Sequence, residues 1–160
     1  MNYARDEIYH EDEIVQCDMC QVTESTIAAL RPLTAKTNPV HADISEETLL
    51  VGVSATDLKR MISNLILNSV DASPEGSPVR VSVQREQNFA VLLVEDYGIG
   101  MSNEVQQRIF DPYFTTKTKG KGTGLGLSVV AGIVYQLKGS IKVMSEQGNG
   151  TTITIKLPLL

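Results

Sequence analysis

The chain has 160 residues, of which 42% are hydrophobic and 21% charged, and its formal net charge is −5. This composition describes one ordinary globular domain with enough apolar side chains for a core. The acidic balance, with no basic cluster beyond the alternation Lys117, Lys119 and Lys121, excludes an electrostatic surface for nucleic acid. No apolar stretch reaches the roughly 18 residues of a membrane span, and the acidic N-terminus is not a signal peptide. We therefore expect a cytoplasmic domain without membrane contact, whose full-length parent can still be membrane-anchored.

The order of apolar patterns and of Pro and Gly residues predicts the elements of the chain. Residues 1–22 are charged and weakly periodic, so we expect an N-terminal tail or the end of a linker helix, followed by one domain over residues 23–160. The predicted elements are, in order, a helix from Thr23 to about Leu30 that can continue, kinked at Pro32, to Ala35; strands Val40–Ile44 and Leu49–Val53; a long helix capped by Ser54 or Thr56 and ended by Pro74 and Gly76; a hairpin of strands Val79–Gln84 and Phe89–Glu95; a short helix Val105–Ile109; a long helix Leu125–Leu137; and strands Ile141–Ser145 and Thr151–Leu157. This order predicts an α+β fold with helices on one face of a mixed sheet.

Three polar residues share one face of the long central helix. Asn64, Asn68 and Asp71 are four and three residues apart, whereas the opposite face is aliphatic. An isolated polar stripe is usually a solvated surface. Asn is a mediocre helix former, however, so two of them among aliphatic residues favour a binding site. Their oxygens are hard ligands suited to Mg²⁺.

A carboxylate followed by glycines ends one predicted strand. Asp96 can accept a hydrogen bond from an exocyclic amine, and Gly98 and Gly100 would let a flat ring approach the backbone. The same pattern also fits a tight turn without a ligand.

A second glycine run, Gly122, Gly124 and Gly126, leads into the last long helix. Backbone amides at a helix N-terminus favour an anion, and a glycine-rich loop without a ligand is the alternative. The run matches neither a P-loop nor a dinucleotide fingerprint. The connection before it is long enough to be a lid or disordered, with Phe110 able to hold it down and Lys117 able to reach a phosphate.

Two cysteines and two histidines are candidate metal ligands. Cys17 and Cys20 form a lone CxxC that could assemble a zinc site or redox pair with His10 and His41. The pair lies in a polar stretch rather than at a strand-to-helix turn, so we favour two unpaired thiols near the domain edge.

Four blocks occur in a fixed order, namely NLILNSVDA (Asn64–Ala72), EDYGIGM (Glu95–Met101), FDPYFTTK (Phe110–Lys117) and GTGLGL (Gly122–Leu127). Together they resemble the catalytic and ATP-binding domain of bacterial sensor histidine kinases, a member of the Bergerat-fold ATPase and kinase superfamily. The resemblance covers roughly residues 23–160. It implies a two-layer α/β sandwich with a mixed, mostly antiparallel sheet, helices on one face and a mobile ATP lid.

The resemblance also implies roles for individual residues. Asn68 would coordinate Mg²⁺, Asn64 would support the phosphate side, and Asp96 would read the adenine amino group. Residues 110–117 would form the lid and residues 122–127 would close over the triphosphate. The implied ATP-binding residues are Asn64, Asn68, Asp71, Asp96, Gly98, Gly100, Phe110, Lys117, Gly122, Thr123, Gly124, Leu125, Gly126, Leu127, Thr151 and Thr152, with Thr151 or Thr152 near the adenine.

By this resemblance the chain is an ATP-dependent protein histidine kinase domain that donates the γ-phosphate to a histidine on a separate dimerisation and phosphoacceptor domain, and so acts indirectly on a response regulator. Related ATPases carry Glu where Asn64 stands, and Asn cannot take a proton from water, so we expect poor hydrolysis. His10 lacks the Pro of the phosphoacceptor motif and is too near Asn64 for the hairpin. Two alternatives stay open: a Ser/Thr kinase similar to anti-sigma factors, and a non-catalytic ATP-sensing module.

Overall fold

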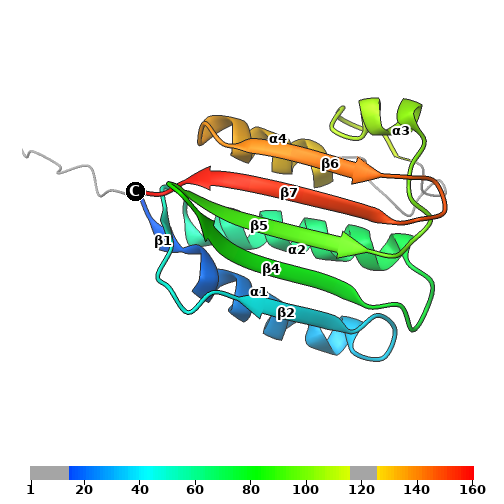
Figure 1. Ribbon diagram of the computed structural model, residues 1–160, viewed down its shortest axis with the longest axis horizontal. Coiled ribbons are helices and arrows are strands. Elements are labelled where there is room, and N and C mark those ends of the chain that lie inside the picture. Colours follow the sequence, from blue (N-terminus) through cyan, green and yellow to red (C-terminus); the bar gives the residue numbers. More distant parts are fainter. Residues whose placement is uncertain (1–14, 116–125) are drawn as a thin grey trace, which may run out of the picture.

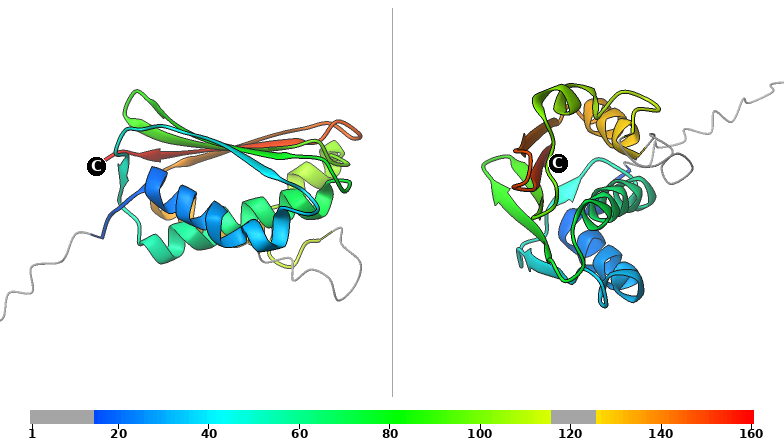
Figure 2. Two further views of the ribbon diagram at one scale, coloured as in Figure 1. Left: turned by 90° about the horizontal axis from the view of Figure 1, so that it is seen from below. Right: turned by 90° about the vertical axis from the view of Figure 1, so that its right-hand side faces the viewer.

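The structure is a computed structural model that describes residues 15–115 and 126–160. A five-stranded sheet forms one layer, and helices packed on one of its faces form the other (Figures 1 and 2). The elements are β1 (Cys17–Asp18), α1 (Met19–Thr34), β2 (Val40–Ile44), β3 (Leu50–Val51), α2 (Ala55–Ala72), β4 (Val79–Glu86), β5 (Phe89–Asp96), α3 (Asn103–Arg108), α4 (Gly126–Gln136), β6 (Ser140–Ser145) and β7 (Thr151–Pro158). The predicted α+β class is confirmed.

The sheet has the strand order β2-β4-β5-β7-β6. Only β2 and β4 pair in parallel, whereas β4–β5, β5–β7 and β6–β7 are antiparallel. The mixed, mostly antiparallel sheet and the β4–β5 hairpin were therefore predicted correctly. Alternating residues of β5 and β7 are buried against the helices, which is the pattern of a sheet covered on one face.

Helix α2 lies between α1 and α4 at the centre of the helical layer (Figure 2). The Ser54 hydroxyl accepts a hydrogen bond from the Asp57 amide at 3.1 Å, so Ser54 is the N-cap and Thr56 lies inside the helix. The apolar stripe of α2 is buried against the sheet through Leu58, Met61, Ile62, Leu65 and Ile66. Each such side chain contributes about 1.5–3 kcal/mol on burial, so this stripe fixes where the polar face of α2 points.

Helix α1 begins four residues before the predicted start at Thr23. Asp18 is its N-cap, and one carboxylate oxygen accepts hydrogen bonds from the amides of Cys20, at 3.1 Å, and Leu49, at 3.0 Å. Met19 is fully buried, so the core includes residues before Thr23. Pro32 does not end the helix, because it lies in the last turn and the Ala35 amide still donates to the Arg31 carbonyl. The predicted continuation of this helix through Pro32 towards Ala35 is therefore confirmed.

The strand after β2 is shorter than the sequence predicts. We expected Leu49–Val53, but only Leu50–Val51 is a strand, paired antiparallel with β1 outside the main sheet. Among the described residues, no helix is long and apolar enough to cross a membrane.

Candidate functional site

The elements around Asp96 meet at one end of the sheet. Strand β5 ends there, β7 begins there, and the C-terminal half of α2 lies beneath them (Figures 1 and 2). The loop after β5 is tied to both layers, because the Ile99 amide donates to the Ala72 carbonyl at the end of α2 and the Ile99 carbonyl accepts from the Gly148 amide. This end of the fold is therefore a fixed frame around the side chain of Asp96.

Asp96 is a buried carboxylate with only 5% of its surface exposed. Its Oδ1 accepts hydrogen bonds from the backbone amides of Gly98, at 3.0 Å, and Thr151, at 3.2 Å. Burial raises the pKa of Asp96, with a smaller contribution from neighbouring Glu95, while the hydrogen bonds from Gly98, Ser69 and Thr151 act to lower it. The carboxylate is thus buried and oriented by two backbone amides at Oδ1 and by the side chain of Ser69.

Two glycines allow the close packing of the loop that follows Asp96. A Cβ atom on Gly98 would lie 2.1 Å from the Ala72 carbonyl oxygen, and one on Gly100 would lie 2.0 Å from the Glu146 carbonyl oxygen. Gly100 also has φ +65°, a backbone conformation that favours glycine. The glycine pattern therefore reflects direct backbone contacts at this end of the sheet.

The paired asparagines of α2 face the start of α4. The Asn64 side-chain nitrogen donates to the Gly126 carbonyl at 3.3 Å. A Cβ atom built on Gly126 would lie 3.7 Å from the side-chain nitrogen of Asn68, which places both asparagines beside this glycine. Asp71 is exposed one turn further along α2. Leu127 packs against the core from the first turn of α4.

The register of β5 and β7 separates the two candidate threonines. Asp96 pairs with Thr151, whereas Thr152 pairs with Glu95 on the opposite face of the sheet, because successive strand residues alternate. Of the two alternatives, Thr151 is the residue that lies beside Asp96. Its hydroxyl is 2.8 Å from that of Ser145, at the end of β6.

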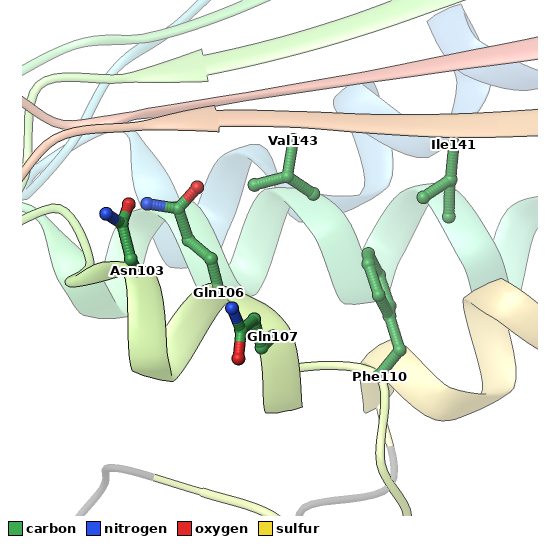
Figure 3. Close-up of a pocket in the computed structure, with 6 residues that line it drawn as sticks. All are labelled: Asn103, Gln106, Gln107, Phe110, Ile141 and Val143. Atoms are coloured by element: carbon green, nitrogen blue, oxygen red, sulfur yellow. The ribbon is translucent and has the colours of Figure 1, made fainter.

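Phe110 lies between helix α3 and the edge strand β6. It lines a cavity of about 380 Å³ together with Gln106 and Gln107 of α3 and with Ile141 and Val143 of β6 (Figure 3). Phe110 follows α3 and faces the apolar side chains of the edge strand. The remaining predicted residues, Lys117, Gly122, Thr123, Gly124 and Leu125, lie outside the described residues, as does His10.

The prediction that the CxxC pair lies away from any strand-to-helix turn is wrong. Cys17 is in β1 and Cys20 in the first turn of α1, so the pair does span a strand-to-helix turn. Burial and the adjacent Asp18 carboxylate raise the pKa of both thiols, that of Cys20 to about 11. Such thiols are protonated at neutral pH, and both cysteines are free. Across residues 15–115 and 126–160, no group of three His, Cys, Asp or Glu side chains could hold a metal ion.

One site residue was missed from the sequence. Ser69 is 6% exposed, and its side chain hydrogen-bonds Asp96 from α2. It lies on the buried stripe of α2, so this helix supplies a partner of the carboxylate from one face and the asparagines from another. A serine at a buried position of an otherwise aliphatic stripe was the available signal, because a buried hydroxyl needs a partner.

Comparison with known proteins identifies the family. A family model described as "Histidine kinase-, DNA gyrase B-, and HSP90-like ATPase" matches residues 53–160, which is more than half of the chain. The chain belongs to this ATPase family. Its match includes α2, the loop after β5, α4 and the last two strands, so all the candidate residues lie within the family region.

Similar proteins include a sensor kinase, a sporulation kinase and a sensor histidine kinase of known structure. The sensor kinase CckA of Brucella abortus is 35% identical over 158 residues, covering 89% of this chain and 17% of CckA. Sporulation kinase B of Bacillus subtilis is 31% identical over 159 residues, covering 99% of this chain and 36% of that kinase. The structure of the mycobacterial sensor histidine kinase MprB matches with a TM-score of 0.78 at 26% identity, covering 90% of this chain and 96% of that chain.

These similarities confirm the predicted resemblance to the catalytic and ATP-binding domain of sensor histidine kinases. They also confirm the two-layer fold. The chain spans 17% and 36% of the length of the two curated relatives, each of which is therefore much longer than the region shared with it.

Proposed function

We propose that this domain binds Mg²⁺-ATP and donates the γ-phosphate to a histidine of a separate dimerisation and phosphoacceptor domain in two-component signalling. The observation that carries the proposal is a buried Asp96 whose Oδ1 is fixed by backbone amides, in the same domain as two asparagines of α2 that lie beside the start of α4. Membership in the ATPase family and the sensor-kinase relatives support the same function.

In this proposal the adenine ring lies against Asp96. Backbone amides already occupy Oδ1, so the other carboxylate oxygen accepts the hydrogen bond from the adenine amino group. Gly98 keeps the neighbouring backbone free of a side chain, which allows a flat ring to come close. Thr151 lines the same corner from β7. The arrangement favours adenine over guanine, because guanine offers a carbonyl at the corresponding position, and that oxygen would face the carboxylate.

The phosphates lie towards Asn64, Asn68 and the start of α4. The amide oxygens of Asn side chains are hard donors that fit Mg²⁺, so Asn68 would hold the ion and Asn64 would support the phosphates. When bound, Mg²⁺ neutralises negative charge on the phosphate oxygens. The backbone at Gly126 approaches both asparagines without a side chain, which leaves room for phosphate oxygens beside α2.

The chemistry needs positioning more than covalent participation by this domain. Phosphoryl transfer requires the donor phosphate, the acceptor nitrogen and the leaving oxygen to lie nearly in line. The acceptor imidazole supplies the nucleophile. Asn64 is a carboxamide that takes no proton from water, so the site favours transfer to a protein histidine over hydrolysis.

The partner is proposed to be a dimerisation and phosphoacceptor domain, normally in the same polypeptide, with a receiver domain downstream. The domain boundaries of the sequence analysis, with the catalytic unit over residues 23–160, belong to this proposal, to which the structure adds the buried Met19 and the capping Asp18. A cytoplasmic location follows from the use of ATP and is proposed with the function.

Phosphotransfer with labelled ATP tests the proposal. The purified domain is mixed with Mg²⁺, γ-labelled ATP and a separately purified histidine phosphoacceptor domain, and the product is treated with acid or alkali. An acid-labile, alkali-stable label on the acceptor supports histidine transfer. An acid-stable label on a hydroxyl would instead support the Ser/Thr kinase alternative. Nucleotide binding without transfer to this or any other supplied histidine domain would support the ATP-sensing alternative.

A further inference from the structure

Helix α3 is held to the edge strand by a single carboxamide. The side-chain nitrogen of Gln106 donates to the Met101 carbonyl at 3.0 Å and to the Ser145 carbonyl at 2.9 Å. Met101 ends the loop that follows Asp96, and Ser145 ends β6. Gln106 therefore connects α3, the loop and the sheet. Figure 3 shows its carboxamide extending from α3 towards β6.

The hydroxyl of Ser145 continues this connection towards the buried carboxylate. It accepts a hydrogen bond from the Met101 amide at 2.9 Å and lies 3.0 Å from the Gly150 carbonyl and 2.8 Å from the Thr151 hydroxyl. The Thr151 amide in turn donates to Asp96. Hydrogen bonds thus run from Gln106 through Ser145 and Thr151 to Asp96, and both polar groups of the Met101 backbone are included.

Helix α3 itself contributes no fully buried side chain. It has six residues, none of them buried, and it borders the cavity lined by Phe110, Ile141 and Val143. The apolar anchor is Ile109, which is 5% exposed and follows the helix. An anchor at one end leaves the other end to rotate, so the carboxamide of Gln106 sets the direction in which the chain leaves towards residue 115.

We propose that Gln106 is a positioning residue that couples the Asp96 end of the site to residues 110–115, the described part of the expected lid. The inference rests on the proposed nucleotide site and extends it. Gln106 does not touch the nucleotide in this account. It orders the loop that contains Gly98 and Gly100, together with α3, before ligand binds, so that less conformational freedom is lost on binding.

Hydrogen exchange of the nucleotide-free domain tests the tether itself. Gln106→Leu removes both donors at similar side-chain size, and Gln107→Leu is the matched control at an exposed position on the same helix. In Gln106→Leu we expect amides of residues 98–115, Met101 above all, to exchange about tenfold faster, as for the loss of one or two net hydrogen bonds. Amides in the middle of α2 and β5 should stay as in the wild type. Faster exchange throughout the domain, or none in residues 98–115, would overturn the proposal.

A charge variant adds a readout that loss of packing would not produce. Glu at position 106 is ionised at pH 7 and donates no hydrogen bond, but its protonated form has one donor. Gln106→Glu should therefore loosen residues 98–115 at pH 7 and recover part of the protection at acidic pH, after correction for intrinsic exchange. Equal protection in Gln106→Glu at both pH values would contradict the assigned role.

Nucleotide titration separates failure of the tether from failure of the site. We expect Gln106→Leu to bind a non-hydrolysable ATP analogue with Mg²⁺ about tenfold more weakly than the wild type, and Gln107→Leu to bind as the wild type does. Equal affinity in Gln106→Leu refutes the coupling. No binding by the wild type refutes the nucleotide site, while the exchange experiment still reports whether the tether exists.

Discussion

Two substitutions of Asp96 distinguish its contribution to nucleotide binding from its contribution to the stability of the fold. Asp96→Asn keeps an oxygen that can accept from the Gly98 and Thr151 amides and replaces the other oxygen with an NH₂ group. That group would meet the adenine amino group donor to donor. Loss of a hydrogen bond to a charged acceptor, together with this mismatch, amounts to about 3 kcal/mol, or roughly a hundredfold weaker binding.

The same substitution should leave the fold as stable as the wild type or more stable at neutral pH. Burial raises the pKa of Asp96, so the protonated form is favoured by folding and the ionised form costs stability. That contribution is present in acid and is lost as the pH rises through the titration of the folded state. A neutral Asn avoids the loss. Its advantage over the wild type should therefore appear on raising the pH and vanish in acid.

Asp96→Ala is the matched contrast, because it leaves both amides without their acceptor. At about 1–3 kcal/mol for each unpaired buried group, we expect it to lower the free energy of unfolding by about 2–6 kcal/mol. Urea unfolding between pH 4 and pH 8, with calorimetric titration of the ATP analogue at pH 7, measures both effects. An Asp96→Asn variant that binds nucleotide like the wild type, or an Asp96→Ala variant as stable as Asp96→Asn, would refute this account of the carboxylate.

Three further substitutions or reactions test the packing around the site and the role of the thiols. Gly98→Ala places a Cβ atom 2.1 Å from the Ala72 carbonyl oxygen, so the unfolding midpoint should fall by the equivalent of about 2 kcal/mol; a wild-type midpoint would argue against this contact. Gly132 is exposed in α4, and a Cβ atom added to it would have no atom within 4 Å. Gly132→Ala should therefore raise the free energy of unfolding by about 0.5–1 kcal/mol in the same assay. A lower unfolding midpoint would contradict the helix assignment. Cys20 should react with iodoacetamide at pH 8 more than roughly a hundredfold slower in the folded than in the unfolded chain, because its pKa is raised to about 11; equal rates would show an exposed, ordinary thiol.

The parts of the fold that follow a long apolar period were predictable from the sequence. Helix α2 repeats apolar residues along most of its length, strands β4, β5 and β7 each carry three apolar residues at alternate positions, and turn residues mark several of their ends. The early start of α1 was not predictable in this way. Its cap, Asp18, is fixed by the Leu49 amide from a distant part of the chain, and such a partner leaves no periodic signal. Strand β3 is likewise shorter than its apolar run because its partner, β1, has only two residues and lies in a distant part of the chain.

The candidate residues could be chosen from the sequence by residue type, whereas their arrangement in space depends on strand register and on partners in other elements. Asp96, Gly98 and the paired asparagines were chosen for their chemistry, and the structure places them at one end of the fold. The choice between Thr151 and Thr152 required the pairing of β5 with β7, because a shift of one residue moves a side chain to the other face. Ser69 and Gln106 were missed because their partners lie on other elements and their residue types are common on helices.

The central claim, that this end of the fold is a Mg²⁺-ATP site, is tested most directly by calorimetric titration of the wild-type domain with a non-hydrolysable ATP analogue. The account predicts saturable binding of one nucleotide that is tightened by Mg²⁺ and lost in Asn68→Ala, which should remain folded because Asn68 is on the polar face of α2 and only partly buried. A folded wild-type domain that takes up no nucleotide with or without Mg²⁺ would contradict the account.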